Sequence, residues 1–245
     1  IETKNPASSP AKKLGEELPG RWLQIYKNMN KKAIERIISS ERLEPYIRYH
    51  DDDFDKALEH YKANIEISEA FYPMLSILEV GLRNNMDYQL TLKFNDDNWF
   101  ENNEFIKIAS SYQIDSISDA RKNIYREKKV VTPGKIIAEL SFGFWTSLFD
   151  AKFEMSLWKN LRLAFPNCPK RIRQRKTMSA KFNGIRKLRN RIFHHEAITW
   201  NLGVVNNYKN EIIEGIDWLN EGLLEWSNDL IHIDKVIDKR KHLIK

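Results

Sequence analysis

The stretch from Arg186 to Trp200, RKLRNRIFHHEAITW, gathers the side chains best suited to chemistry. Its first ten residues hold three arginines, a lysine, an asparagine and two adjacent histidines. An imidazole exchanges protons near neutral pH, and a guanidinium group binds phosphate oxygens in a forked geometry. Cleavage of RNA by its own 2′-hydroxyl needs a base, an acid and a cationic group at the phosphate. We therefore expect a ribonuclease site here, without a metal or another cofactor.

A helix predicted over residues 171–195 must position these side chains. Its apolar residues share one face at about 100° per residue: Met178, Phe182, Ile185, Leu188 and Ile192. Arg189 lies within about 40° of the centre of that face, where a guanidinium group needs an acid or a phosphate unless it reaches solvent. His194 points away from the face, so it is either exposed or meets a second protein surface. Asn190 precedes it by four residues, and its amide could orient the imidazole.

The spacing of arginine and histidine is weakly specific by itself. With 15 arginines and six histidines in 245 residues, about one such match is expected by chance. A helix end whose cations interact with the C-terminal dipole would explain the same residues.

Positive charge is concentrated around this stretch. Residues 155–195 contain 12 Lys or Arg and no Asp or Glu, whereas the other 204 residues carry 28 basic and 34 acidic groups. Such a segment attracts polyanions and makes their binding salt-dependent, although a solvated basic helix face is the alternative. We expect RNA contacts from nine of its residues: Lys170, Arg171, Arg173, Arg175, Lys176, Lys181, Arg186, Lys187 and Arg191.

The periodicity elsewhere predicts an all-α protein. Helices are expected over residues 21–38, 54–94 with Pro73 as a possible kink, 116–127, 135–165 as a buried two-helix hairpin, 171–195 and 204–230. Pro133 fits a first helical position, and Phe144 and Trp145 are expected in the core. We expect a flexible lead-in at 1–20, a single domain at 21–230 and a charged tail at 231–245.

Composition narrows the class of protein. Hydrophobic residues make up 42% of the chain and charged residues 30%, as in soluble globular proteins. No apolar run approaches the roughly 20 residues that span a bilayer, and residues 1–20 lack the apolar centre of a signal peptide. The single cysteine, Cys168, excludes an intrachain disulfide and a cysteine-based zinc site. We expect a cytoplasmic protein that makes no membrane contact.

The sequence RNRIFHHE resembles the HEPN ribonuclease motif, with Arg189-Asn190 followed by His194. More widely, the chain is similar to the Abi-like (abortive infection, AbiD/AbiF-type) family in three blocks: SILEVGLRNNMDYQL at 76–90, LSFGFWTSLF at 140–149 and IRKLRNRIFHHEAI at 185–198. The resemblance implies a HEPN-like helical bundle with additional helices, assembled as a homodimer in which two motifs face each other. It also implies a metal-independent endoribonuclease that acts as a toxin in phage defence, with an antitoxin or a structured RNA as a candidate regulator.

The same resemblance assigns roles to three residues. Arg189 would hold the scissile phosphate and stabilise the extra negative charge of its transition state. His194 would act as general base or acid, and Asn190 would orient the histidine or the substrate. One such histidine per chain is half of an acid–base pair, and a dimer would supply the other half.

Residues next to the motif have two interpretations each. His195 is a second catalytic imidazole or a structural neighbour. Glu196 ends the helix, or pairs with Arg189 or Arg191.

The block at 76–90 offers a second group of supporting residues. Glu79 and Arg83 are four apart and form a surface ion pair, or they contact the site around Arg189 together with Asn84.

Two other functions fit the same sequence. A non-catalytic RNA-binding or RNA-sensing module would keep the basic face without cleaving RNA. A protein-interaction component of a toxin–antitoxin system would use exposed helix faces instead.

Overall fold

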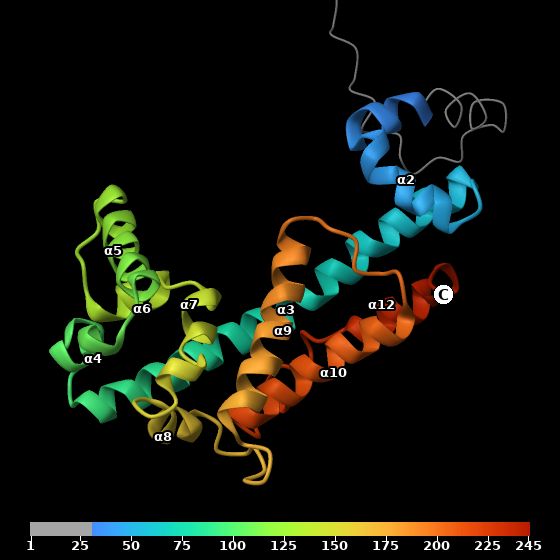
Figure 1. Ribbon diagram of the computed structural model, residues 1–245. Coiled ribbons are helices and arrows are strands. Elements are labelled where there is room, and N and C mark those ends of the chain that lie inside the picture. Colours follow the sequence, from blue (N-terminus) through green and yellow to red (C-terminus); the bar gives the residue numbers. More distant parts are fainter. Residues whose placement is uncertain (1–30) are drawn as a thin grey trace, which may run out of the picture. The chain divides into compact units, whose positions relative to one another are not determined.

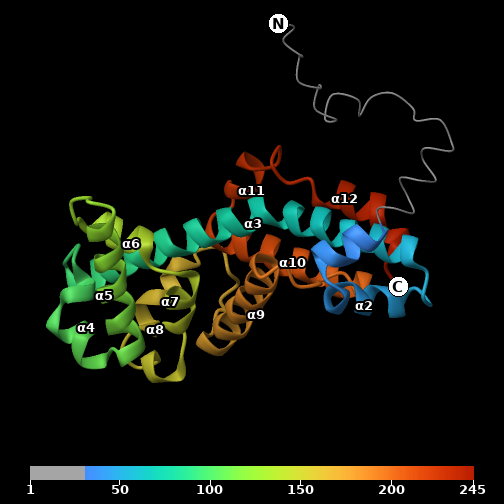
Figure 2. The same ribbon diagram turned by 90° about the horizontal axis from the view of Figure 1, so that it is seen from above.

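Every regular element between residues 31 and 245, the part of the chain that the computed structural model describes, is a helix (Figures 1 and 2). The all-α prediction is therefore confirmed for this part of the chain. Two compact units meet in sequence between Glu59 and His60. The lead-in expected at 1–20 and the start of the helix expected at 21–38 lie outside the described residues, while residues 31–38 are helical.

The first unit contains α2 (Ser40–Tyr49) and the start of α3 (Phe54–Phe94). Ser39 caps α2, because its Oγ accepts a hydrogen bond from the amide of Arg42 at 3.4 Å. Asp53 caps α3 in the same way, since its Oδ1 accepts from the amide of Lys56 at 3.0 Å. The hydrogen bond from the Lys56 amide also lowers the pKa of the Asp53 carboxyl.

Helix α3 carries most of the second unit. It is a single helix of 41 residues, about 60 Å long, and Pro73 lies inside it without ending it. Five apolar residues at helical spacing along α3 are buried: Phe71, Leu75, Leu78, Leu82 and Met86. Buried residues of the other helices of the unit pack into the same hydrophobic core as these side chains.

Short helices follow α3: α4 (Asn103–Ile108), α5 (Ser111–Arg126), α6 (Pro133–Glu139), α7 (Phe142–Ser147) and α8 (Trp158–Leu161), with 3₁₀ turns between some of them. Pro133 opens α6 as predicted. The two-helix hairpin predicted over residues 135–165 is wrong. Ser141 interrupts it by starting α7, where its Oγ accepts from the amide of Phe144 at 3.2 Å, and Asp150 precedes another 3₁₀ turn.

The aromatic residues of this stretch nevertheless lie in the core, as predicted. Phe144 and Trp145 are fully buried and pack edge to face, with ring centroids 5.3 Å apart. Phe149 and Phe165 pack against Phe182 of α9 at centroid distances of 5.7 and 5.3 Å. This second aromatic group anchors the helix that bears the motif.

Helix α9 (Arg175–Phe193) begins four residues later than predicted, because residues 169–173 form a turn in which Pro169 O accepts from the amides of Ile172 and Arg173. Helix α10 (Leu202–Leu219) packs beside it and beside α3 (Figures 1 and 2). A Cβ at Gly215 would lie 3.1 Å from a methyl carbon of Leu78, so glycine allows this close approach.

The helix predicted over residues 204–230 is shorter than expected. It ends at Leu219, and α11 (Leu223–Trp226) follows after Asn220, whose Oδ1 accepts from the amide of Gly222 at 2.9 Å.

Residues 231–245 form α12 (Ile233–Arg240) and a 3₁₀ turn rather than extending as a tail. Ile233 and Ile237 are buried in the common core. Arg240 and Lys239 hold the pKa of Glu66 on α3 at about 2, mainly through the hydrogen bond from Arg240. The segment is charged on one side, and it packs because its apolar residues recur at helical spacing.

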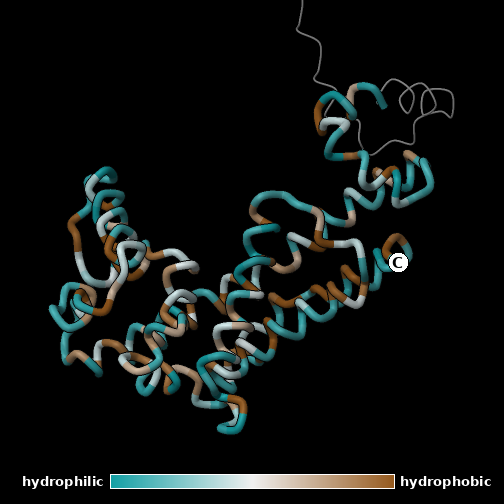
Figure 3. The backbone as a smooth tube through the Cα atoms, in the orientation of Figure 1, coloured by the Kyte–Doolittle hydropathy of each residue, from teal (hydrophilic) through white to brown (hydrophobic). Residues whose placement is uncertain are grey.

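Hydrophobic and hydrophilic residues are interspersed along every helix of the described part of the chain, so none of these helices is hydrophobic throughout (Figure 3). Within residues 31–245, no helix is both long and apolar enough to cross a membrane.

Candidate functional site

The motif lies where α9 ends, and a Schellman turn fixes the two histidines there. The amide of His195 donates to the carbonyl of Ile192 at 3.0 Å, and the amide of Glu196 donates to the carbonyl of Arg191 at 2.8 Å. His194 is the C-cap, and His195 adopts the left-handed conformation, with φ of 57°. Glycine is the usual residue at that position, so a histidine there is conformationally strained.

Arg189 meets an acid on the packed side of the helix, one of the outcomes that its position predicts. Its Nε lies 3.6 Å from Oε2 of Glu79 on α3, and its guanidinium lies over the ring of Phe193, 4.4 Å from the centroid. The side chain is 32% exposed. Nε is buried without a hydrogen-bond partner, and the terminal nitrogens have none among the described residues. The donors of the two terminal nitrogens are therefore available for a phosphate.

His194 is exposed, as the helical wheel predicts. Between residues 31 and 245 its imidazole has no hydrogen-bond or ion-pair partner. Asn190 contacts His194 through the backbone, since its carbonyl accepts from the His194 amide at 2.9 Å. The predicted orientation of the imidazole by the Asn190 side-chain amide is not found: no hydrogen bond joins the two side chains in the described part of the chain, and α9 ends before His194.

The segment after the histidines is held to α3 by a buried hydrogen-bond network. Oδ1 of Asn64 accepts from the amide of Ile198 at 2.8 Å and from the hydroxyl of Thr199 at 3.2 Å, and its Nδ2 donates to the carbonyl of Glu196 at 3.4 Å. Nε2 of His60 lies 2.9 Å from the carbonyl of Thr199. The position of the motif thus depends on polar groups more than 130 residues away in sequence.

Asn64 and His60 were not predicted from the sequence as site residues, although their positions in the sequence contain one indication. They lie four apart on the buried side of α3, between Ala57 and Ile67, where the other residues are apolar. Two polar residues inside an apolar stripe require hydrogen-bond partners, which the loop after α9 supplies.

Of the residues expected to support the motif, two contact its arginines and two lie elsewhere in the second unit. Glu79 contacts Arg189 directly, and Glu196 pairs with Arg191 at 3.4 Å. Arg83 instead donates to the carbonyl of Ala138 at 3.2 Å and to Asn84 at 3.3 Å, so both lie apart from the motif.

Several of the nine residues expected to bind RNA have structural contacts. Lys181 is 6% exposed, and its Nζ lies 2.5 Å from carboxylate oxygens of both Glu211 and Glu214. Nε of Arg175 lies 2.8 Å from Glu154, and Arg173 donates to the carbonyl of Phe165 at 2.9 Å. Arg191 also donates to the carbonyl of Ala197.

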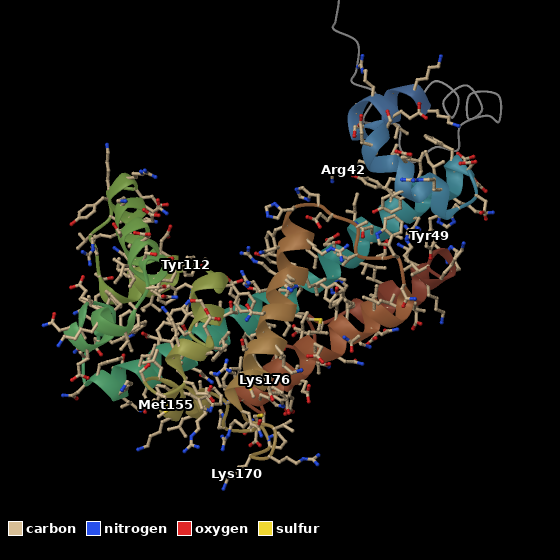
Figure 4. All side chains as sticks on the ribbon, in the orientation of Figure 1. Arg42, Tyr49, Tyr112, Met155, Lys170 and Lys176 are labelled. Carbon is tan, nitrogen blue, oxygen red and sulfur yellow. The ribbon has the colours of Figure 1, made fainter. Side chains whose placement is uncertain are left out.

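Other cations of the segment have no acidic partner within residues 31–245. Lys170, Arg171 and Lys176, here called the N-terminal basic cluster, are exposed around the start of α9. Figure 4 shows Lys170 and Lys176 at the lower end of that helix. Arg186 and Lys187 also lack a carboxylate partner, and they lie closer to the motif. The N-terminal basic cluster and the motif thus lie at opposite ends of α9, with Arg186 and Lys187 nearer to the motif.

No group of three or more His, Cys, Asp or Glu side chains that could hold a metal ion occurs in the described part of the chain. Burial raises the pKa of the Cys168 thiol to about 11, so this cysteine is a poor nucleophile at neutral pH.

Comparisons of the chain with protein-family models, with curated proteins and with solved structures gave no match.

Proposed function

We propose that this protein is a metal-independent HEPN-type endoribonuclease, similar to the Abi-like family and acting as a toxin in phage defence. The observation that carries the proposal is the pairing of His194 with Arg189. Among residues 31–245 the exposed imidazole of His194 has no partner, and the guanidinium of Arg189 keeps donors without hydrogen-bond partners. The Schellman turn and Glu79 hold both groups on one helix end. They would supply the base and the cationic group that cleavage by a 2′-hydroxyl requires, and the acid is the group still needed.

The reaction follows from these groups. A neutral imidazole of His194 would take the proton of the 2′-hydroxyl as its oxygen attacks the neighbouring phosphorus. The 5′-oxygen would leave with a proton from a second imidazole, producing a 2′,3′-cyclic phosphate and a 5′-hydroxyl. Arg189 would stabilise the additional negative charge on the phosphoryl oxygens.

The second imidazole is proposed to come from a second copy of the chain. His194 is exposed at the helix end, so it can meet an equivalent residue across a twofold axis. The three sequence blocks that resemble the Abi-like family support the assignment, because one residue from each lies in the same core: Leu78, Phe149 and Ile185.

The test is incubation of the purified protein with defined single-stranded and structured RNAs. We expect internal cleavage, products with 2′,3′-cyclic phosphate ends, and unchanged activity in EDTA. Products with 3′-hydroxyl ends, or loss of cleavage on chelation, would reject the proposed chemistry.

A second candidate function is a non-catalytic RNA-binding module. The N-terminal basic cluster favours it, because these cations have no acidic partner within residues 31–245 and lie at the other end of α9 from the motif. Such a protein would bind RNA with a strong salt dependence and would leave it intact, and substitution of His194 would not change the affinity.

A further inference from the structure

A groove of about 420 Å³ lies beside the candidate site, between α3 and the end of α9. One face of α3 forms its first wall, with Tyr61, Ile65, Ser68, Glu69 and Tyr72. The second wall is the last turn of α9 and the Schellman turn, including Phe193. The groove is therefore continuous with the residues that present the motif.

The aromatic walls of this groove are open to solvent. Tyr72 is 56% exposed and Phe193 is 44% exposed, and their ring centroids lie 6.1 Å apart. The guanidinium of Arg189 covers part of the Phe193 ring. Exposed rings next to a cation are the arrangement by which proteins stack unpaired nucleobases while holding the adjoining phosphate.

Two polar groups of the groove have no hydrogen-bond or ion-pair partner among the described residues. They are the hydroxyl of Ser68 and the carboxylate of Glu69. The amide of Asn64, in contrast, is fully engaged with the loop after α9. An unpaired carboxylate repels a polyanion unless it meets hydrogen-bond donors. The Watson–Crick edge of guanine is the one base edge with two adjacent N–H donors, at N1 and N2, and a carboxylate can accept both.

The dimensions favour a base over a second protein chain. A small-molecule pocket measures about 300–1,000 Å³, and the groove lies within that range. The nine residues described around it are far fewer than the roughly 20–30 residues per side of a stable protein interface.

We infer that this groove binds an unstacked guanine of single-stranded RNA, with the adjoining phosphate at Arg189. Tyr72 and Phe193, whose ring planes are inclined at 52°, would pack together against the base. Glu69 would accept hydrogen bonds from N1–H and N2–H. The inference rests on the proposed function for its ligand class, and it adds a base preference and the residues that determine it.

The test measures binding of uncleavable 2′-O-methyl pentanucleotides, UUGUU, UUAUU, UUCUU and UUUUU, to the full chain by fluorescence anisotropy. We expect UUGUU to bind at least about 5-fold more tightly than the other three. Tyr72→Ala should weaken UUGUU binding at least about 5-fold, whereas Tyr88→Ala, which removes a similarly exposed tyrosine elsewhere on α3, should not. Glu69→Gln should abolish the preference for guanine and leave UUAUU binding unchanged, with Glu221→Gln as the matched control.

The outcomes separate this inference from the nuclease assignment. Retained guanine preference in a protein that cleaves no RNA rejects the nuclease and keeps the groove. Equal binding of the four pentanucleotides, or no binding of any, overturns the inference even if RNA is cleaved. A Tyr72→Ala protein that binds UUGUU normally but changes its oligomeric state would show that the groove receives a second copy of the chain.

Discussion

The two ends of α9 differ in how firmly their charged groups are held. Around its start, Lys170, Arg171 and Lys176 are exposed and have no acidic partner among residues 31–245. At its end, Arg189 is held between Glu79 and Phe193, and the backbone around His194 is fixed by a Schellman turn. About 27 Å of helix separates Lys176 from His194.

The two ends of α9 therefore suit different steps of binding and catalysis. Attraction of a polyanion needs charge but no exact geometry, and it is screened beyond about 8 Å at physiological ionic strength. Proton transfer needs groups positioned within hydrogen-bond reach. The basic cluster is thus suited to capture of RNA and the motif to its cleavage, and the two ends can be altered separately.

Substitution of the motif histidine should produce the largest effect. His194→Ala removes the proposed base, so the rate of RNA cleavage should fall about 10²–10⁴-fold. RNA affinity should change less than 2-fold, because the cations at the other end remain. Cleavage rates under saturating protein, together with circular dichroism, provide the measurement. His242→Ala, at another exposed histidine, is the control and should keep full activity; an equal loss there would contradict the assignment.

Loss of the N-terminal basic cluster should weaken RNA binding and leave the cleavage rate unchanged, the reverse of the result expected for His194→Ala. Replacing Lys170, Arg171 and Lys176 with alanine should weaken RNA binding about 10-fold or more at physiological salt. The slope of log affinity against log salt should fall by about 2, since each phosphate contact contributes about 0.7 for a single strand. The cleavage rate at saturating RNA should be unchanged.

A matched control for this variant replaces three exposed cations elsewhere in the second unit: Lys107, Arg126 and Lys235. If both triple variants reduce the salt slope equally, the distinction between the two ends of α9 fails.

The buried network tests whether the motif end depends on fixed geometry. Asn64→Ala leaves the amide of Ile198 without its partner, which should cost about 1–3 kcal/mol of unfolding free energy. Cleavage should decline as well, because the turn that carries the histidines loses its attachment to α3. Urea denaturation and cleavage assays measure the two effects. Asn210→Ala, on the exposed face of α10, should change stability by less than about 0.5 kcal/mol.

The smallest predicted effect distinguishes the two interpretations of His195. Because its φ is 57°, His195→Gly relieves left-handed strain and should raise the unfolding free energy by up to about 1 kcal/mol. If the residue is structural, cleavage should stay within a few-fold of the parent. A loss of cleavage as large as that of His194→Ala would instead make both imidazoles catalytic.

Periodicity predicted much of the architecture around the motif. The buried face of α9 follows from apolar residues three and four apart, and the structure buries Phe182, Ile185 and Leu188 as expected. Helix boundaries were harder to predict in residues 135–165. Apolar residues occur on all sides of the expected helices there, and a single capping serine decides where one helix ends and the next begins. Burial was therefore predictable in this stretch, and helix boundaries were not.

The site was predictable in part for a similar reason. The helical wheel predicts that Arg189 reaches solvent or meets an acid or a phosphate, and Glu79 was among the residues expected near it. The attachment of Ile198 and Thr199 to Asn64 joins segments 134 and 135 residues apart, and local sequence patterns do not encode such pairings. The groove beside Tyr72 likewise exists only once α3 and α9 are packed together.

The contact between Arg189 and Glu79 has a consequence for turnover. An RNA phosphate that arrives at the guanidinium competes with a carboxylate already 3.6 Å away. In the proposed ribonuclease this tethered competitor would be present at high effective concentration, so it would lower the affinity for substrate and product alike. Product bound through its new cyclic phosphate would be displaced as the guanidinium returned to Glu79. The same carboxylate that holds the arginine between reactions would thus accelerate release after each one.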